Sequence, residues 1–135
     1  MANQLFAKGL EAFLAGDADW DANTMKVVFV DHADDTPVPA TDDNLDDILS
    51  AARVATSVAL ASKTTTDGVA DAADVTVTAV TGDPFESIVI YKDTGVETTS
   101  RLLAFIDTAT GLPTTPNGGD ITVAWDNGSN KIFKL

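Results

Sequence analysis

The densest group of possible metal ligands lies at residues 17–21. Asp17, Asp19 and Asp21 occupy every second position ahead of "NTMKVVFVD", and carboxylate oxygens are the ligands that Ca²⁺ prefers. A calcium loop of the EF-hand type needs Gly at its sixth position and Glu at its twelfth. Counted from Asp17, these positions hold Ala22 and Val28. We therefore predict a turn that leads into a strand, with a weak metal site as the alternative.

The only histidine, His32, follows Asp31 and precedes Asp34 and Asp35. Such a group can form a weak metal site from carboxylate oxygens and one imidazole, or the imidazole can act as a general base. A base needs a nucleophile, and no Gly-x-Ser-x-Gly pattern is present. We interpret His32 as an exposed loop residue among solvated acids.

No other pattern in the chain indicates a reaction. There is no cysteine, which excludes disulfides, thiolate nucleophiles and cysteine-ligated zinc. The segment "PNGGD" at 116–120 precedes a strand, whereas a phosphate-binding loop follows one and opens a helix. Trp20, Tyr91 and Trp125 would form a sugar-stacking platform only if they faced outward, and Trp125 alternates in phase with inward-facing residues. We predict that the protein is not an enzyme and has no cofactor.

The charge of the chain narrows its possible partners. Eight basic and 21 acidic residues give a net charge of -13, which repels phosphate backbones and anionic lipids. We therefore expect no nucleic-acid partner. No segment is long and apolar enough to span a membrane, and the N-terminus lacks the features of a signal peptide, so we expect synthesis and use without Sec export.

Two helices are predicted in the N-terminal part of the chain. The first covers 4–15, between Asn3 as N-cap and Gly16 as the stop, and the second lies near 42–52 after a cap at Thr41. The loop between them carries two prolines and many aspartates, which prevents regular structure. Apolar spacing predicts a stripe on the first helix that docks on its own sheet or on a neighbouring chain. The stripe is formed by Leu5, Phe6, Leu10, Phe13 and Leu14, and the inward residues of the second helix are Leu45, Ile48 and Leu49.

The rest of the chain is predicted to consist of strands. Apolar alternation and turn signals indicate about seven of them, with a hairpin around Asp93-Thr94-Gly95 and a tight turn at Asn127-Gly128. The predicted strands lie at 24–30, 53–63, 74–80, 86–92, 101–107, 121–125 and from 132 onward. We therefore predict a mainly β fold, a single-domain antiparallel β-sandwich or jelly-roll-like domain over 17–135, preceded by a helical segment at 1–16 that is available for an interface.

Three segments of the C-terminal half carry a family resemblance: "VIYKDTG" at 89–95, "IDTATGLP" at 106–113 and "NGGDITV" at 117–123. With "DWDANTMKVVFVD", they make residues 17–135 similar to a family of small tailed-bacteriophage proteins. The resemblance implies a structural role in the virion, with decoration or cementing of the capsid as the first interpretation. A tail, neck or head-fibre component is the alternative. These segments are turns and hairpins and carry no catalytic residues.

This resemblance implies that the partners are the major capsid protein or other virion proteins, and that assembly takes place in the bacterial cytoplasm. Our first hypothesis is a decoration protein that forms a trimer or another small ring through the N-terminal segment and the 31–44 loop. The second is a module that binds a host receptor or glycan through exposed Trp20 and Tyr91 and loop acids. The candidate interface residues are Leu5, Phe6, Leu10, Phe13, Pro37 and Pro39.

Overall fold

The computed structural model describes residues 3–135. Within this range the strands are β1 (Gln4–Leu5), β2 (Met25–Val30), β3 (Arg53–Thr56), β4 (Val69–Ala70), β5 (Val75–Val77), β6 (Ser87–Lys92), β7 (Leu102–Ile106), β8 (Ile121–Val123) and β9 (Phe133–Lys134), the α-helix is α1 (Ala7–Ala15), and the 3₁₀ turns are η1 (Leu45–Asp47), η2 (Ser50–Ala52), η3 (Thr66–Gly68) and η4 (Glu97–Thr99). The predicted mainly β fold is confirmed, with nine strands in the described residues where about seven were expected.

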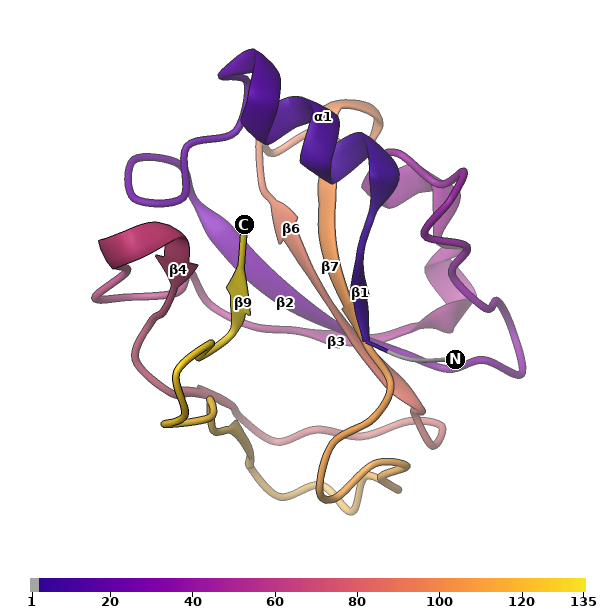
Figure 1. Cartoon of the computed structure of the whole chain (residues 1–135). Helices are drawn as coiled ribbons and strands as arrows, with labels where there is room; N and C mark the ends of the chain where they lie inside the picture. The colour runs from indigo at the N-terminus through magenta and orange to yellow at the C-terminus, as the bar shows by residue number, and fades with distance from the viewer. Residues whose placement is uncertain (1–2) are drawn as a thin grey trace.

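The main sheet has five antiparallel strands in the order β1-β7-β6-β2-β3 (Figure 1). Strand β2 lies inside it and pairs with β6 on one side and β3 on the other. The predicted hairpin is confirmed, because β6 pairs with β7 across the 93–101 loop. Strand β2 is buried on both faces rather than mainly on one, so the sheet lies between two apolar clusters.

The two small sheets cover one face of the main sheet and make the fold roughly sandwich-like. β4 pairs with β9 and β5 pairs with β8, and their apolar residues pack with Met25, Val27 and Phe29 of β2. The opposite face carries Val28 and Val30 and is covered by the 31–52 segment. The covering layer on the first face is short, since each of its strands has only two or three residues.

Helix α1 begins later than predicted. Gln4 and Leu5 pair with β7 as strand β1, and Phe6 is the N-cap residue with extended backbone and no side-chain cap. Asn3 is not the cap, because its side chain bonds the backbone of Asp107 and Thr108 instead. The end at Gly16 is confirmed: its φ of 80° is left-handed, which favours glycine.

The predicted apolar stripe does not match the buried face of α1. Gly9 and Ala12 face inward, and an added Cβ at Gly9 would lie 2.6 Å from the Leu102 carbonyl oxygen. Helix α1 therefore approaches the β7 backbone more closely than any side chain permits. This close approach turns the stripe aside, so that Leu10 is 39% and Leu14 is 91% exposed.

The predicted helix near 42–52 consists of the two 3₁₀ turns η1 and η2, separated by extended backbone at Ile48 and Leu49. The Asp35 carboxylate accepts a hydrogen bond from the Leu49 N–H at 2.8 Å and holds this segment open. The Asp47 carboxylate accepts the Asp43 N–H, so the turn is closed by a residue other than the expected Thr41 cap. Ile48 is buried as predicted, whereas Leu49 is 57% exposed.

Two strand predictions also need correction. The 53–63 segment is a strand only to Thr56, because the Ser57 hydroxyl accepts the Val27 N–H, and Val58 is 68% exposed. Asn127-Gly128 does not join a hairpin, since β8 pairs with β5 while β9 pairs with β4. Asp74 accepts the Trp125 N–H at 2.9 Å and holds the β8 segment against the β5 segment.

Candidate functional site

The acids at 17–21 form a turn, as predicted. The Asp19 carboxylate accepts the backbone N–H groups of Asp21 and Ala22, each at 3.1 Å. The ammonium groups of Lys63 and Lys92 donate to the backbone carbonyl oxygens of Asn23 and Asp17, respectively. The Asp19 carboxylate therefore accepts backbone hydrogen bonds of the turn, and the two lysine side chains supply positive charge beside it.

His32 is half-buried and contacts Ser87, so the prediction of an exposed loop residue is wrong. Its Nε2 lies 2.8 Å from the Ser87 hydroxyl, and its ring stacks on Phe105 with centroids 6.0 Å apart. A histidine beside a serine is the geometry of a base with its nucleophile. Ser87 is 0% exposed, however, so no substrate reaches its oxygen. The pair fixes the end of β2 to β6, a contact over 55 positions that no local pattern signals.

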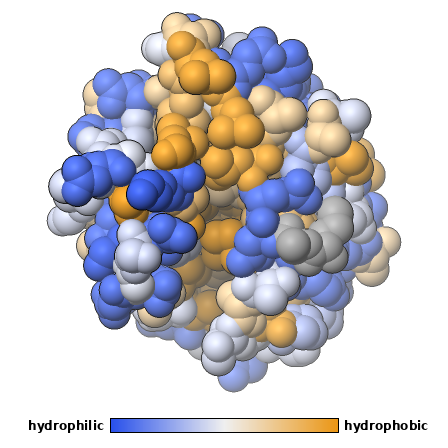
Figure 2. Space-filling view, in the orientation of Figure 1, coloured by the Kyte–Doolittle hydropathy of each residue, from blue (hydrophilic) through white to orange (hydrophobic). Residues whose placement is uncertain are grey.

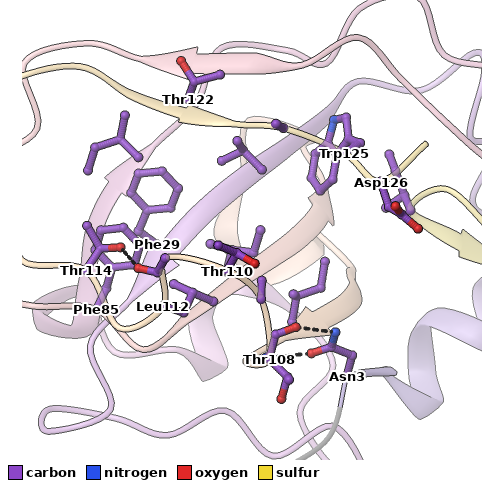
Figure 3. Close-up of a pocket in the computed structure, with 18 of the residues that line it drawn as sticks. Asn3, Phe29, Phe85, Thr108, Thr110, Leu112, Thr114, Thr122, Trp125 and Asp126 are labelled. Carbon is purple, nitrogen blue, oxygen red and sulfur yellow. Dashed lines mark hydrogen bonds between the residues drawn. The ribbon is translucent and has the colours of Figure 1, made fainter. Parts of the chain in front are cut away.

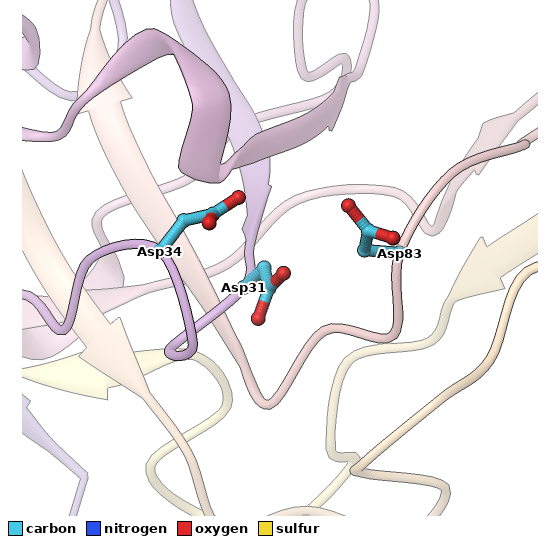
Figure 4. Close-up of side chains that lie close together, drawn as sticks. All are labelled: Asp31, Asp34 and Asp83. Atoms are coloured by element: carbon cyan, nitrogen blue, oxygen red, sulfur yellow. The ribbon is translucent and has the colours of Figure 1, made fainter.

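Asp31, Asp34 and Asp83 form the one group of three acidic or histidine side chains in residues 3–135 that is close enough to share a cation (Figure 4). Their carboxylate oxygens lie within 4.8 Å of one another. Asp31 is buried and accepts the Ala33 N–H at 2.8 Å, while Asp34 and Asp83 are exposed. Sequence reasoning grouped Asp31 and Asp34 with His32 and missed Asp83, which comes from the loop after β5.

The three aromatic residues considered for glycan stacking are buried. Trp20 and Trp125 are 4% and 8% exposed, and their indole N–H groups donate to the Asp71 and Ala73 carbonyls. Tyr91 is 3% exposed, and burial raises its pKa to about 12. The predicted burial of Trp125 is confirmed. The outward aromatic platform of the second hypothesis is not formed.

The predicted interface residues are divided between core and surface. Phe6, Pro37 and Pro39 are buried within the chain, and Phe6 packs edge-on against Phe105. Leu5 and Phe13 are half-buried. The Ala7 N–H donates to the Pro39 carbonyl at 2.9 Å, so the two segments do meet. The apolar side chains that they expose are Leu10, Leu14 and Val38.

An apolar groove of about 700 Å³ lies where the two small sheets leave part of the main sheet uncovered (Figure 3). Its floor includes Phe29 of β2, Ile88 of β6 and Phe85, which lies just before β6. One wall is the 108–112 segment and the other is 121–126, which contains β8. Figure 2 shows this hollow as an apolar region that continues upward toward α1. Sequence reasoning missed the groove because its walls come from separate loops.

No protein-family model matches this chain, and no curated protein matches it. In the part of the chain that the structure describes, no helix is long and apolar enough to cross a membrane.

Proposed function

We propose that this protein is a non-enzymatic structural component of a tailed-bacteriophage virion that decorates or cements the capsid as a small oligomer, with a trimer favoured. The observation that carries the proposal is the apolar surface that the fold leaves open. It comprises the groove and the exposed leucines of α1. Contiguous apolar surface on a small acidic domain is typical of a protein that is completed by protein partners.

Leu14 is the sharpest feature of this surface. It is 91% exposed on a well-formed helix whose other face is fixed to β7 through Gly9. A rigid helix that presents a leucine to solvent offers a preorganised contact, so little ordering entropy is lost on association. We propose that α1 makes the contact between copies through Leu14 and Leu10, together with the exposed Val38 of the 31–44 loop.

The charge of the chain fits a repetitive lattice. A net charge of -13 disfavours non-specific aggregation, so that copies associate only through a specific contact. A small ring that touches a symmetric shell at several equivalent points binds with high avidity even when each contact is weak. The groove and α1 then have separate roles, the groove toward the shell and α1 between copies.

Size-exclusion chromatography with light scattering tests the proposal on the purified protein, alone and mixed with capsids of a phage from which its gene has been deleted. We expect a defined small oligomer that co-elutes with the capsids. Leu14→Asp should yield monomers, and Leu135→Asp is the matched control at an exposed leucine outside α1. A protein that does not bind capsids but binds purified tails or necks would refute decoration and support the alternative location.

A further inference from the structure

We propose that the groove beside β8 binds an extended peptide segment of a partner, which adds to β8 as a further strand and carries apolar residues between basic ends. This inference rests on the proposed function only for the source of the segment, a protein of the virion. Its physical basis is a free strand edge above an apolar floor in a strongly acidic chain.

The free edge follows from the lining of the groove. Residues 121–124 line it consecutively, yet side chains of a strand alternate between opposite faces. Four successive residues border one cavity only if the backbone edge of the strand faces it. β8 pairs with β5 alone among the strands of residues 3–135, so alternate N–H and C=O groups of β8 point into the groove without a strand partner.

An extended peptide matches these groups better than a compact ligand does. Strand addition supplies the missing main-chain hydrogen bonds, and pockets for every second side chain give selectivity. Five residues, 121–125, span about 17 Å at a rise of about 3.3 Å per residue. The volume of about 700 Å³ falls within the range of known ligand-binding clefts. Apolar side chains on alternate positions would cover Phe29 and Ile88 on the floor.

The net charge of the whole chain favours a basic partner. The chain carries a net charge of -13. Asp126 lies in the lining of the groove, whereas the Asp120 carboxylate beside β8 accepts the Ala79 N–H at 3.0 Å. Lys131 is the one basic residue in the lining. An apolar segment with Lys or Arg at both ends is attracted to this strongly acidic chain and can pair with Asp126, whereas acidic ends are repelled.

The test uses the full chain and a synthetic peptide of about eight residues, in which valine alternates with threonine between terminal lysines. We expect saturable binding by calorimetry, with amide shifts at Ile121, Thr122 and Val123 in nitrogen-15 NMR spectra. N-methylation of alternate peptide amides should weaken binding about tenfold or more, because it removes ladder donors. Glutamate in place of the lysines should weaken it by a similar factor.

Matched variants locate the site. Thr110→Trp places an indole on the wall opposite β8 and should abolish peptide binding, whereas Thr115→Trp, also exposed but outside the lining, should not change it. Asp126→Asn should weaken binding several-fold, whereas Asp46→Asn on the other side of the sheet should have no effect. No saturable binding, or equal binding of the N-methylated peptide, would overturn the inference.

The two proposals fail separately. Peptide binding without capsid binding would refute the decoration role and support the groove. Capsid binding that persists unchanged in Thr110→Trp, together with no binding of the peptide, would support decoration and refute strand addition.

Discussion

The packing of α1 on β7 yields a prediction whose sign opposes ordinary helix behaviour. Gly9 lies inside α1 and has no left-handed backbone that requires glycine, so Gly9→Ala would ordinarily stabilise the helix by about 1 kcal/mol. Here the added Cβ meets the Leu102 carbonyl oxygen at 2.6 Å and the Leu103 Cα at 2.9 Å. Both are backbone atoms, which cannot rotate away.

The cost follows from the shift that α1 must make. An ordinary contact begins at 3.4 Å, so the helix has to move by about 0.8 Å. A gap of about 0.5–1 Å removes a quarter to a half of the dispersion energy of the contacts that open. The hydrogen bond from the Phe6 N–H to the Leu103 carbonyl, 2.9 Å long, is strained by the same movement. Overpacking of about 3 kcal/mol less the propensity gain of about 1 kcal/mol leaves a net loss of about 2 kcal/mol.

Urea unfolding followed by circular dichroism measures this loss. We expect Gly9→Ala to lower the free energy of unfolding by about 2 kcal/mol with an unchanged slope. Ala15→Gly, at the exposed end of the same helix, reports the local propensity and should cost about 1 kcal/mol or less. A Gly9→Ala protein that is more stable than the wild type would show that α1 does not touch the β7 backbone.

Three further predictions concern the surface, the buried tyrosine and the acid cluster. Leu14→Asp should change the free energy of unfolding by less than about 0.5 kcal/mol but reduce the mass measured by light scattering, and an unchanged mass would exclude α1 as the contact between copies. Burial raises the pKa of Tyr91 from 10.0 to about 12, so the unfolded chain loses the phenolic proton first and the free energy of unfolding falls from pH 10 to 12. Ultraviolet absorbance of this only tyrosine should show ionisation together with unfolding, Tyr91→Phe should lack the pH dependence, and tyrosinate in a folded chain at pH 10 would contradict the burial. Asp83→Asn removes one of three carboxylates that lie within 4.8 Å of one another and should stabilise the fold by up to about 1 kcal/mol at low salt. Thermal melts should no longer show this gain at about 1 M salt. No gain at low salt would mean that the three charges do not repel.

Sequence patterns predicted the elements whose cause is local. Gly16 ends α1 because its own backbone is left-handed. The strands on either side of Asp93-Thr94-Gly95 pair because a short connection leaves them adjacent. Trp125 is buried because it continues the alternation of β8. In each case the residues that determine the structure lie within a few positions of one another.

The remaining features depend on partners distant in sequence. Spacing alone favours the leucines as the inner face of α1, and only the β7 backbone makes Gly9 the contact point. Asn127-Gly128 predicted a hairpin, but the Asp74 carboxylate accepts the Trp125 N–H and β9 pairs with β4 instead of β8. Asp83 joins Asp31 through a loop 52 positions away along the chain. The groove likewise needs two walls that no single segment encodes.

The acidic residues Asp120 and Asp126, which flank β8, explain how a β domain can keep an open strand edge in solution. A free edge above an apolar floor invites pairing with any exposed strand, including the same edge of a second copy. Two copies that approach through β8 bring Asp120 and Asp126 of one chain against the same residues of the other, and both chains carry a net charge of -13. This repulsion disfavours pairing between copies, whereas a basic segment is attracted to the acidic chain. The same carboxylates therefore protect the edge before assembly and select the partner that covers it.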